Sequence, residues 1–337
     1  MKELLRAKGI YAALLMLVAI STSTFAQNIV EPPSAFPSRP VRLIVPYAPG
    51  GVGDILARVL AQKMSDVLTQ PVIVENRGGA GGTLGSNYVA KSAPNGYTMV
   101  FSSLATVSIA PHLIKSIPYD PVKDFSAIGG VAITPNILVV SAAPESSAQF
   151  KTLRELVIYA RANPGKLTFG SSGVGSIGHL AGELLHTSTG ADMLHVPYGG
   201  SALAYPGLIT GSLSMMFDTL PSAIQQIRTG RVRGVAVMSD KRSPLLSDVP
   251  TFAEAGYPEA TLRFWLGLHG PANLPSAVVQ RLNDATRKAL GMADLRERFA
   301  GLGADPFPTT PQELADLTRN DLERLGKTVR DAGIKPD

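Results

Sequence analysis

The feature that most constrains the fold is a repeated order of apolar strand, glycine-rich turn and helix. Residues 41–45 (VRLIV) form an apolar run, residues 46–53 (PYAPGGVG) form a turn, and residues 54–68 carry apolar side chains at helical spacing. Two more strands follow over residues 72–76 and 97–103, with a second glycine-rich turn and a short helix between them. This alternation predicts an α/β fold with a doubly wound, mainly parallel sheet.

The same order recurs in the middle of the chain. Strands alternate with amphipathic helices over residues 136–141, 152–163, 166–170, 177–189, 192–197, 201–210, 213–218, 222–230 and 232–238. The C-terminal part has no predicted strands, and its helices are expected over residues 276–290, 293–302 and 311–331. Because such a helical stretch must pack on another unit, we expect the chain to leave a first unit near Pro135 and to return near Glu259.

The length agrees with two units, because 337 residues exceed the size of one ordinary domain. We predict a discontinuous lobe I, residues 27–134 and 260–337, and a lobe II, residues 135–259. With 45% hydrophobic and 17% charged residues, the chain can bury large cores and is not disordered.

The N-terminus has the pattern of a secretory signal peptide. Lys2, Arg6 and Lys8 precede the apolar run IYAALLMLVAI, and small residues stand at Thr24 and Ala26. The run is shorter than the roughly 20 residues that a membrane-spanning helix needs. We therefore expect residues 1–26 to be removed after Ala26 and the remaining chain to be exported, with the bacterial periplasm as the expected compartment.

The composition excludes several kinds of function. The chain contains no cysteine, which excludes disulfides, thiolate metal sites, a cysteine nucleophile and a lipid-modified N-terminal cysteine. The formal net charge is +5, or 5 − 3 + 1 = +3 without residues 1–26, and the remaining basic residues are scattered among acidic ones. We expect no nucleic-acid partner, because such partners are bound by a basic patch or stripe.

Four turns occupy the positions at which open parallel sheets bind ligands, after the carboxyl ends of strands. They are residues 47–54 (YAPGGVGD), 102–106 (SSLAT), 171–176 (SSGVGS) and 198–201 (YGGS), and none contains Lys or Arg. Glycine lets backbone N–H groups approach a ligand closely, and helix N-termini add free donors and a partial positive charge. The turns therefore predict an anion site that is built from backbone donors.

Backbone donors alone do not account for useful affinity. One helix N-terminus contributes about 0.3–1 kcal/mol to a neighbouring anion, or about 2 kcal/mol when partly buried. A micromolar ligand needs about 8 kcal/mol. We therefore expect hydrogen bonds from the hydroxyl groups of Ser103, Ser172 and Ser176, and enclosure of the ligand between two closing domains.

Other chemistries have little support in the sequence. The phosphate-loop pattern G-x-x-x-x-G-K-[ST], the zinc motif H-E-x-x-H and the nucleophile elbow G-x-S-x-G do not occur. His179 and Glu183 have the spacing of an ordinary stabilising pair on a helix, and the GGAGG run over residues 78–82 reads mainly as a turn. Asp218 ends an apolar strand, where it either binds a ligand or caps the next helix. We expect no catalysis, no metal ion and no cofactor.

Several segments, taken in their order along the chain, resemble one family. They are PSRPVRLIVPYAPGGVGDILAR, VIVENRGGAGGTLGSNYVAKSAPNGYT, LTFGSSGVGSIGHLAGE, HVPYGGSALA and MMFD. Together they are similar to the Bug family, the substrate-binding proteins of tripartite tricarboxylate transporters, over essentially the whole chain after residue 26. The resemblance implies the two-lobed Venus flytrap fold of type II periplasmic binding proteins. It also implies a small carboxylate held by backbone amides, hydroxyl groups and ordered waters.

The resemblance assigns ligand-binding residues in both lobes. Lobe I would contribute Tyr47, Ala48, Pro49, Gly50 and Gly51, with Asp54 opening the helix as its N-cap, and Ser103 and Thr106 from the third strand. Lobe II would contribute Ser172, Gly173, Gly175 and Ser176, opposed by Tyr198, Gly199 and Gly200, with Asp218 at the rim.

The function implied by the resemblance is that of a periplasmic receptor. Such a receptor captures a carboxylate between its lobes and delivers it to a membrane complex of one large and one small integral subunit, and we expect this chain to be a monomer. Two alternatives stay open: an orphan sensor that docks on a signalling partner, and a secreted carboxylate-processing enzyme that uses Ser176 and His179. The sequence does not identify the carboxylate.

Overall fold

The computed structural model of the protein describes residues 35–143, 150–331, 333 and 336. Backbone contacts separate residues 1–35 from a compact unit, Phe36–Asp337, to which every helix and strand below belongs. The predicted signal peptide, residues 1–26, lies outside the described residues. Within the described part of the chain, no helix combines the length and the apolar character needed to cross a membrane.

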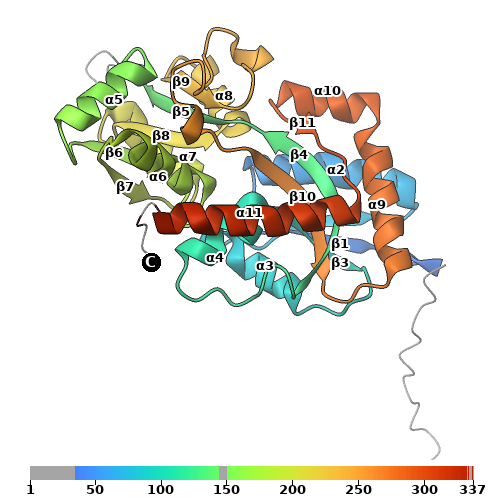
Figure 1. The fold of residues 1–337 in the computed structure, drawn as a ribbon. Helices are drawn as coiled ribbons and strands as arrows, with labels where there is room; N and C mark the ends of the chain where they lie inside the picture. The colour runs from blue at the N-terminus through green and yellow to red at the C-terminus, as the bar shows by residue number, and fades with distance from the viewer. Residues whose placement is uncertain (1–34, 144–149, 332, 334–335, 337) are drawn as a thin grey trace, which may run out of the picture. The chain divides into compact units, whose positions relative to one another are not determined.

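The first sheet combines a parallel trio of strands with antiparallel ones (Figure 1). Its strand order over the described residues is β11-β4-β10-β3-β1-β2, in which β1 pairs in parallel with both β2 and β3. β10 is antiparallel to β3 and β4, and β11 is antiparallel to β4. The strands are β1 (Val41–Val45), β2 (Val72–Asn76), β3 (Thr98–Ser103), β4 (Phe125–Thr134), β10 (Phe264–Pro271) and β11 (Asp305–Pro306).

The second sheet repeats this plan with the strand order β7-β6-β8-β5-β9. β6 pairs in parallel with β7 and β8, and β5 is antiparallel to β8 and β9. The strands are β5 (Asn136–Ser141), β6 (Leu167–Ser171), β7 (Met193–Pro197), β8 (Met215–Thr219) and β9 (Val232–Met238). The predicted alternation of strands and helices around two parallel-rich sheets is confirmed.

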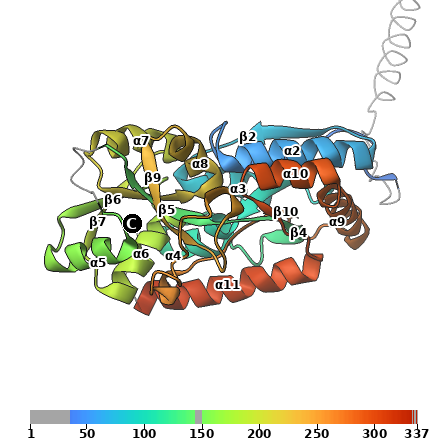
Figure 2. The ribbon, with the colours of Figure 1, turned by 90° about the horizontal axis from the view of Figure 1, so that it is seen from above.

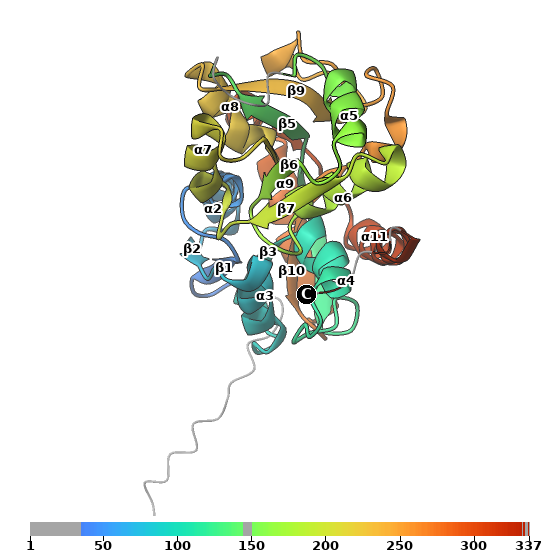
Figure 3. The same ribbon diagram turned by 90° about the vertical axis from the view of Figure 1, so that its left-hand side faces the viewer.

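Helices cover both faces of the second sheet (Figure 3). α5 (Leu153–Ala162) and α6 (Ile177–Thr189) lie on one face, and α7 (Ser201–Thr210) and α8 (Leu220–Arg228) lie on the other. Neighbouring residues of β8 show the alternation. Phe217 belongs to the same apolar core as Leu180 of α6, whereas Met216 belongs to a separate core with Leu208 of α7.

The first sheet is covered in the same way. α2 (Val52–Leu68) packs beside α10 (Ala293–Gly301), where Lys63 and Asp294 form an ion pair of 2.5 Å (Figure 2). α9 (Ser276–Leu290) contacts α2 and β4, and α11 (Pro311–Asp331) runs along β4 (Figure 1). Shorter segments complete this half of the unit, namely η3 (Ala80–Gly82), α3 (Thr83–Ala90), η4 (Ala105–Ile109) and α4 (Ala110–Leu113).

The start of α2 corrects one prediction. Asp54 was expected to be the N-cap, but the helix begins at Val52 and its N-cap is Gly51, which has no side chain to cap the helix. Asp54 lies in the first turn instead. The prediction was wrong because the N-cap position falls on the last glycine of the turn, three residues before Asp54.

The C-terminal part confirms the helices and corrects the absence of strands. The three predicted helices match α9, α10 and α11 to within one residue. The two-residue strand β11, however, lies between α10 and α11 and pairs with Ile133 and Ala132 of β4. A two-residue strand has no sequence pattern of its own. It is defined only by its hydrogen bonds to β4, which lies far away in the chain.

Candidate functional site

The turn between β1 and α2 is tied to the end of β3 by side-chain hydrogen bonds. Tyr47 OH lies 2.6 Å from Ser103 Oγ, and the Ser103 N–H donates to Thr106 Oγ1 over 3.1 Å. Ser103 and Thr106 are fully buried, and burial raises the pKa of Tyr47 to about 12, so its phenol stays protonated at neutral pH. Because β1 and β3 are parallel neighbours, three of the predicted site residues meet at the same edge of the sheet.

The tip of this turn is open to solvent. Ala48, Pro49, Gly50 and Gly51 are exposed, and Gly50 has a φ of 82°, which favours glycine. The first N–H groups of a helix have no partner within the helix. Since Gly51 brings no capping side chain, the N-terminus of α2 presents free backbone donors at this tip.

The side chain of Asp54 stabilises the conformation of this turn by hydrogen bonds. Its buried carboxylate accepts hydrogen bonds from the Gly50 N–H and from Asn76 Nδ2, both at 2.9 Å, and pairs with Arg58 at 2.9 Å. Burial alone would raise the pKa of Asp54, but the hydrogen bonds from Arg58, Gly50 and Asn76 outweigh it, and the net pKa is lowered. The carboxylate and the Gly50 N–H are thus both engaged within the protein.

The turn between β6 and α6 presents a second helix N-terminus. Ser176 is the N-cap of α6, and its Oγ accepts the His179 N–H over 3.2 Å. Gly173 and Gly175 have φ values of 131° and 74°, and Ser172 is partly exposed. The predicted turn and the predicted helix start are therefore confirmed, and the N–H groups of Ile177 and Gly178, which precede the capped His179 N–H, have no partner within the helix.

The turn before α7 lies directly against the turn before α6. The Tyr198 N–H donates to the Ser171 carbonyl over 3.1 Å. A β-carbon placed on Gly173 would lie 3.2 Å from the Tyr198 carbonyl oxygen. Gly200 is the N-cap of α7, and Gly199 beside it is exposed. The structure thus brings the two predicted turns of the second sheet together.

Asp218 is bound to the start of α7, directly after the turn formed by Tyr198, Gly199 and Gly200. Its carboxylate accepts hydrogen bonds from Ser201 Oγ at 2.7 Å and Tyr205 OH at 2.8 Å, both on α7, and from the Thr219 N–H at 2.8 Å. Burial raises the pKa of Asp218, and hydrogen bonds with Ser222, with the two α7 hydroxyls and with the Thr219 N–H oppose the rise only in part. Of the two roles left open, the capping of α8 is not seen, because Thr219 is the N-cap residue of that helix. Asp218 instead anchors the start of α7.

Turns from the two sheets touch each other. A β-carbon on Gly81, in the GGAGG run, would lie 3.1 Å from the Val174 carbonyl oxygen in the turn before α6. A β-carbon on Gly175 would lie 3.3 Å from Ile114 Cδ1 and 3.6 Å from Ala110 Cα. The GGAGG run, whose Gly78 lies against Ala48 of the turn before α2, therefore meets the turn before α6.

Comparison with known proteins identifies the family. Residues 56–334 match the model of the tripartite tricarboxylate transporter family receptor. The chain belongs to this receptor family.

Relatives of the receptor include proteins of known structure. The receptor is 35% identical to BugT of Bordetella pertussis over 323 residues, which is 95% of this chain and 98% of BugT. An R. palustris protein solved with adipate is 33% identical, with a TM-score of 0.84 over 90% of this chain and 100% of that one. MatC of Rhodopseudomonas palustris with bound malate is 33% identical, with a TM-score of 0.80 over 87% and 100%. These matches confirm the predicted Bug family, the two-lobed periplasmic-binding-protein fold and the role of a transport receptor.

A stack of three aromatic rings lies beside the turn before α6 of the receptor. The rings of His179 and His195 are parallel within 6° at 4.0 Å, and His195 also stacks on Phe169 at 4.8 Å. Burial, with a contribution from His179, lowers the pKa of His195 to about 3, so this ring is neutral at physiological pH. His195 Nε2 lies 2.7 Å from Ser171 Oγ, which also accepts the Gly173 N–H.

The hydroxyl of Ser176 and the ring of His179 both accept hydrogen bonds from backbone N–H groups. Ser176 Oγ accepts the His179 N–H, and His179 Nδ1 accepts the Gly175 N–H over 3.4 Å. Both contacts shape the turn. A general base would instead have to accept the serine hydroxyl proton.

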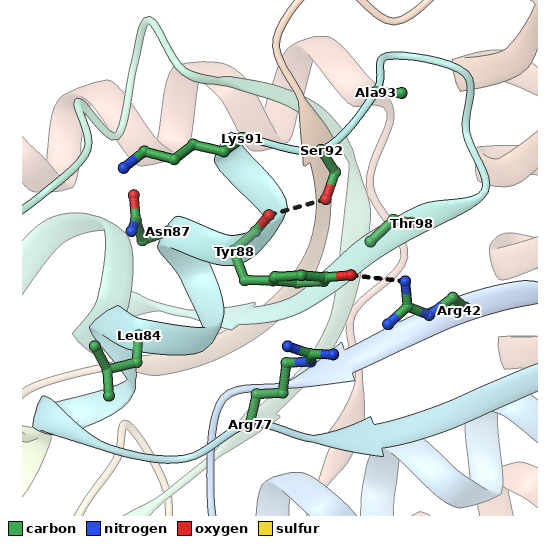
Figure 4. A pocket seen from close by; sticks show the side chains of 9 residues that line it. All are labelled: Arg42, Arg77, Leu84, Asn87, Tyr88, Lys91, Ser92, Ala93 and Thr98. Carbon is green, nitrogen blue, oxygen red and sulfur yellow. Dashed lines mark hydrogen bonds between the residues drawn. The ribbon is translucent and has the colours of Figure 1, made fainter.

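A separate basic pocket lies beside α3, where Arg42 of β1 and Thr98 of β3 also line it (Figure 4). It has a volume of about 660 Å³ and is lined by Arg42, Arg77, Leu84, Asn87, Tyr88, Lys91, Ser92, Ala93 and Thr98. Arg42 forms a two-pronged pair with Glu75 at 2.5 and 2.7 Å, and Arg77 lies 3.8 Å from the centre of the Tyr88 ring. None of the predicted site residues lines this pocket.

Sequence reasoning missed three residues that shape the site. Asn76 bonds both Asp54 and the Tyr47 carbonyl, Ser171 bonds His195 and Gly173, and Gly81 touches the opposite turn. Asn76 and Ser171 end strands directly before glycine-rich turns, which is a signal that was available. The contact of Gly81 has no such signal, because its partner belongs to the other sheet.

Proposed function

We propose that the receptor captures a small organic carboxylate between lobe I, residues 27–134 and 260–337, and lobe II, residues 135–259. The observation that carries this proposal is that the glycine turns before α2 and α6, which contain no Lys or Arg, each lead into a helix N-terminus, and that Gly81, in the run beside Ala48, contacts Val174 of the turn before α6. The adipate and malate bound by the two R. palustris proteins support the same ligand class.

The proposed contacts differ between the two turns. On lobe I, the N-terminus of α2 donates backbone N–H groups at the tip formed by Ala48, Pro49, Gly50 and Gly51, and Tyr47, Ser103 and Thr106 support it. On lobe II, the carboxylate meets the first-turn N–H groups of α6 and the turns formed by Ser172, Gly173, Gly175, Ser176, Tyr198, Gly199 and Gly200. Asp54 and Asp218 act as supports, because both carboxylates are already hydrogen-bonded by the protein.

Closure of the two lobes on the ligand supplies the remaining affinity. Two helix N-termini contribute about 2–4 kcal/mol together when partly buried, which is less than half of what micromolar binding requires. Hydrogen bonds that are formed out of water, and to a charged acceptor, are worth about 1.5–3 kcal/mol each. A ligand that contacts both lobes therefore stabilises the closed state, whereas a ligand that contacts one lobe does not.

We further propose that the receptor works without chemical change of its ligand. It acts as a monomer in the periplasm after cleavage behind Ala26, and it delivers the carboxylate to a transporter with one large and one small integral subunit. The engagement of Ser176 and His179 with the backbone supports binding over catalysis. Recovery of the unchanged acid by mass spectrometry after prolonged incubation tests this point, and conversion of the acid would refute it.

Valine at Gly51 or Gly199 tests the backbone site directly. A β-carbon meets only Ala48 O at 3.6 Å in the first case and Leu203 Cδ1 at 3.5 Å in the second, which are ordinary contacts, and neither glycine has a positive φ. The side chain would instead cover the N–H groups offered to the ligand. We expect Gly51→Val and Gly199→Val each to weaken binding of the best acid in a calorimetric panel by about tenfold or more.

A matched control separates this effect from stability. Gly301 ends α10, has open space around it and lies on the surface, so Gly301→Val should bind like the wild type. All three variants should keep the apo melting temperature within a few degrees, because a poor N-cap costs about 1 kcal/mol. Wild-type affinity in Gly51→Val or Gly199→Val would refute the backbone site.

A further inference from the structure

A cluster of buried polar atoms lies where the chain crosses from the first sheet to the second. Thr134 Oγ1, Asn136 Nδ2, Asn136 Oδ1 and Thr219 Oγ1 have no hydrogen-bond partner among the described residues. Thr134 and Asn136 are 0% exposed, and Thr219 is 6% exposed. Buried polar atoms are almost always paired, because an unpaired one loses its hydration without compensation. Four such atoms in one place call for a functional explanation.

Strand pairing places Asn136 beside Thr219, and Thr134 precedes Asn136 by two residues where the chain crosses between the sheets. Asn136 and Thr219 stand opposite each other at the ends of the antiparallel strands β5 and β8. Opposite residues of an antiparallel pair lie on the same face of the sheet and contact each other. Thr134 is the last residue of β4, one residue before Pro135, whose carbonyl accepts the Leu220 N–H over 2.8 Å. The cluster therefore occupies the direct link between the two sheets.

The cluster lies at the strand ends from which the binding turns of both sheets start. In the first sheet, Thr134 pairs with Phe264 of β10, and Leu266 of β10 pairs with Ser103 at the end of β3. In the second sheet, β8 ends at Thr219 and runs parallel to β6, whose end leads into the turn before α6. The unpaired atoms are thus on the side of both sheets from which α2 and α6 start.

Strand alternation decides which face of the second sheet the cluster is on. Asp218 points to α7, where Ser201 and Tyr205 bind it. Thr219 therefore points to the opposite face, as Phe217 does. That face carries the first turn of α6, since a β-carbon on Gly178 would lie 2.5 Å from the Phe217 carbonyl oxygen. Asn136 and Thr219 thus continue the surface on which the free N-terminus of α6 rests.

We propose that Thr134, Asn136 and Thr219 form a second subsite, which binds an uncharged hydrogen-bonding group at the far end of the carboxylate ligand. This inference rests on the proposed function and names its substrate class: small carboxylates with a hydroxyl or carboxamide group.

The chemistry of the cluster selects that group. An asparagine amide and two hydroxyls together offer both donors and acceptors, and a hydroxyl or carboxamide matches both. A second carboxylate has acceptors only. It would face Asn136 Oδ1, and neither the cluster nor the four binding turns contain a Lys or Arg to neutralise it. An apolar end would leave all four atoms unpaired.

A matched series of four-carbon acids tests the subsite by calorimetry. The probes are butanoate, 4-hydroxybutanoate, succinamate and succinate, which differ only at the far end. We expect the wild type to bind 4-hydroxybutanoate or succinamate at least about tenfold more tightly than butanoate and succinate. In Asn136→Ala and Thr219→Val this preference should fall to about threefold or less, while butanoate affinity stays within about twofold of the wild type.

Stability provides a second readout that does not depend on the ligand. Thr219→Val replaces an unpaired buried hydroxyl by a methyl group of the same shape, so the apo melting temperature should rise. Thr286→Val is the matched control, because the buried Thr286 hydroxyl donates to the Leu282 carbonyl over 2.8 Å, and its loss should lower the melting temperature without altering acid preference.

The outcomes separate the subsite from the proposed function. Equal weakening of all four acids by Asn136→Ala and Thr219→Val, tighter wild-type binding of succinate than of succinamate, or a lowered melting temperature of Thr219→Val would each overturn the subsite. If no acid of this series or of the wider panel binds the wild type at millimolar concentration, the proposed function itself fails. Binding without discrimination at the far end refutes the subsite alone.

Discussion

At the scale of single residues, two buried acidic side chains illustrate how the site is supported. Asp54 lies in the first turn of α2 and Asp218 lies near the end of β8, directly before α8, and both were predicted to be ligand contacts. In the structure each carboxylate accepts hydrogen bonds from the protein. Gly50 and Asn76 donate to Asp54, and Ser201 and Tyr205 of α7 donate to Asp218. Each carboxylate thus fixes the backbone of a glycine turn that belongs to the proposed site.

Asp54→Asn measures this support. Removal of the charge weakens the hydrogen bonds from Gly50, Asn76 and Arg58, and bonds to a charged group are worth about 1.5–3 kcal/mol. We expect the free energy of unfolding at pH 7 to fall by about 2 kcal/mol, as measured by chemical denaturation. Asp316→Asn is the control, because Asp316 forms an exposed pair with Arg319 and surface pairs contribute little.

The pH dependence of this difference has a definite sign. The pKa of Asp54 in the folded state is lowered from its ordinary value near 3.8. The stabilisation is therefore fully present above pH 4 and is lost as the pH falls through the lowered folded-state value. The wild type and Asp54→Asn should converge at the acid end of the titration. A difference that grows on acidification would contradict the assigned role of Asp54.

At the scale of elements, local patterns predict the strands and helices that carry the turns. They do not predict a strand that is defined by its pairing with distant strands. The apolar runs of β1, β2 and β3 and the helical spacing of α2 and α11 are visible in the sequence. β10 contains two glycines and was not predicted, because its partners β3 and β4 are far away in the chain. The partners of Asp218 were not predictable for a related reason: alternation along β8 reverses the face with each residue, and the sequence does not say which face holds α7.

The contact between the turns can be tested with a pair of glycines that share one conformation. Gly81 and Gly190 have φ values of 64° and 70°, so Ala at either position costs about 1–2 kcal/mol of stability. Only Gly81 faces the opposite turn, where a β-carbon would lie 3.1 Å from the Val174 carbonyl, whereas Gly190 has open space. We expect both variants to lose similar stability in denaturation, while Gly81→Ala alone binds the best acid about fivefold more weakly.

Two results would count against a closing contact at Gly81. Unchanged acid affinity in Gly81→Ala would mean that the turns need not touch when the ligand is bound. Equal loss of affinity in Gly190→Ala, at the end of α6, would show that the effect follows general destabilisation and not the contact.

At the scale of the whole molecule, the protein joins two sheets that are built on the same plan. Each places a parallel trio of strands so that glycine turns and free helix N-termini gather at one edge, and these edges meet through Gly81 and Val174. The alternation of strands and helices around two sheets was predictable from the order of the elements. The meeting of the turns was not, because it depends on how the two halves pack and not on any local pattern. The family of transport receptors to which the chain belongs fits a site that opens and closes.

The most direct test of this account is a crystal structure of the receptor with the acid that binds it most tightly. We predict that the carboxylate oxygens accept hydrogen bonds of about 2.7–3.1 Å from first-turn N–H groups of both α2 and α6, with no Lys or Arg side chain in contact. An acid bound to only one of these helices, or seated beside Arg77 and Lys91 in the basic pocket, would contradict capture by two opposed backbone turns.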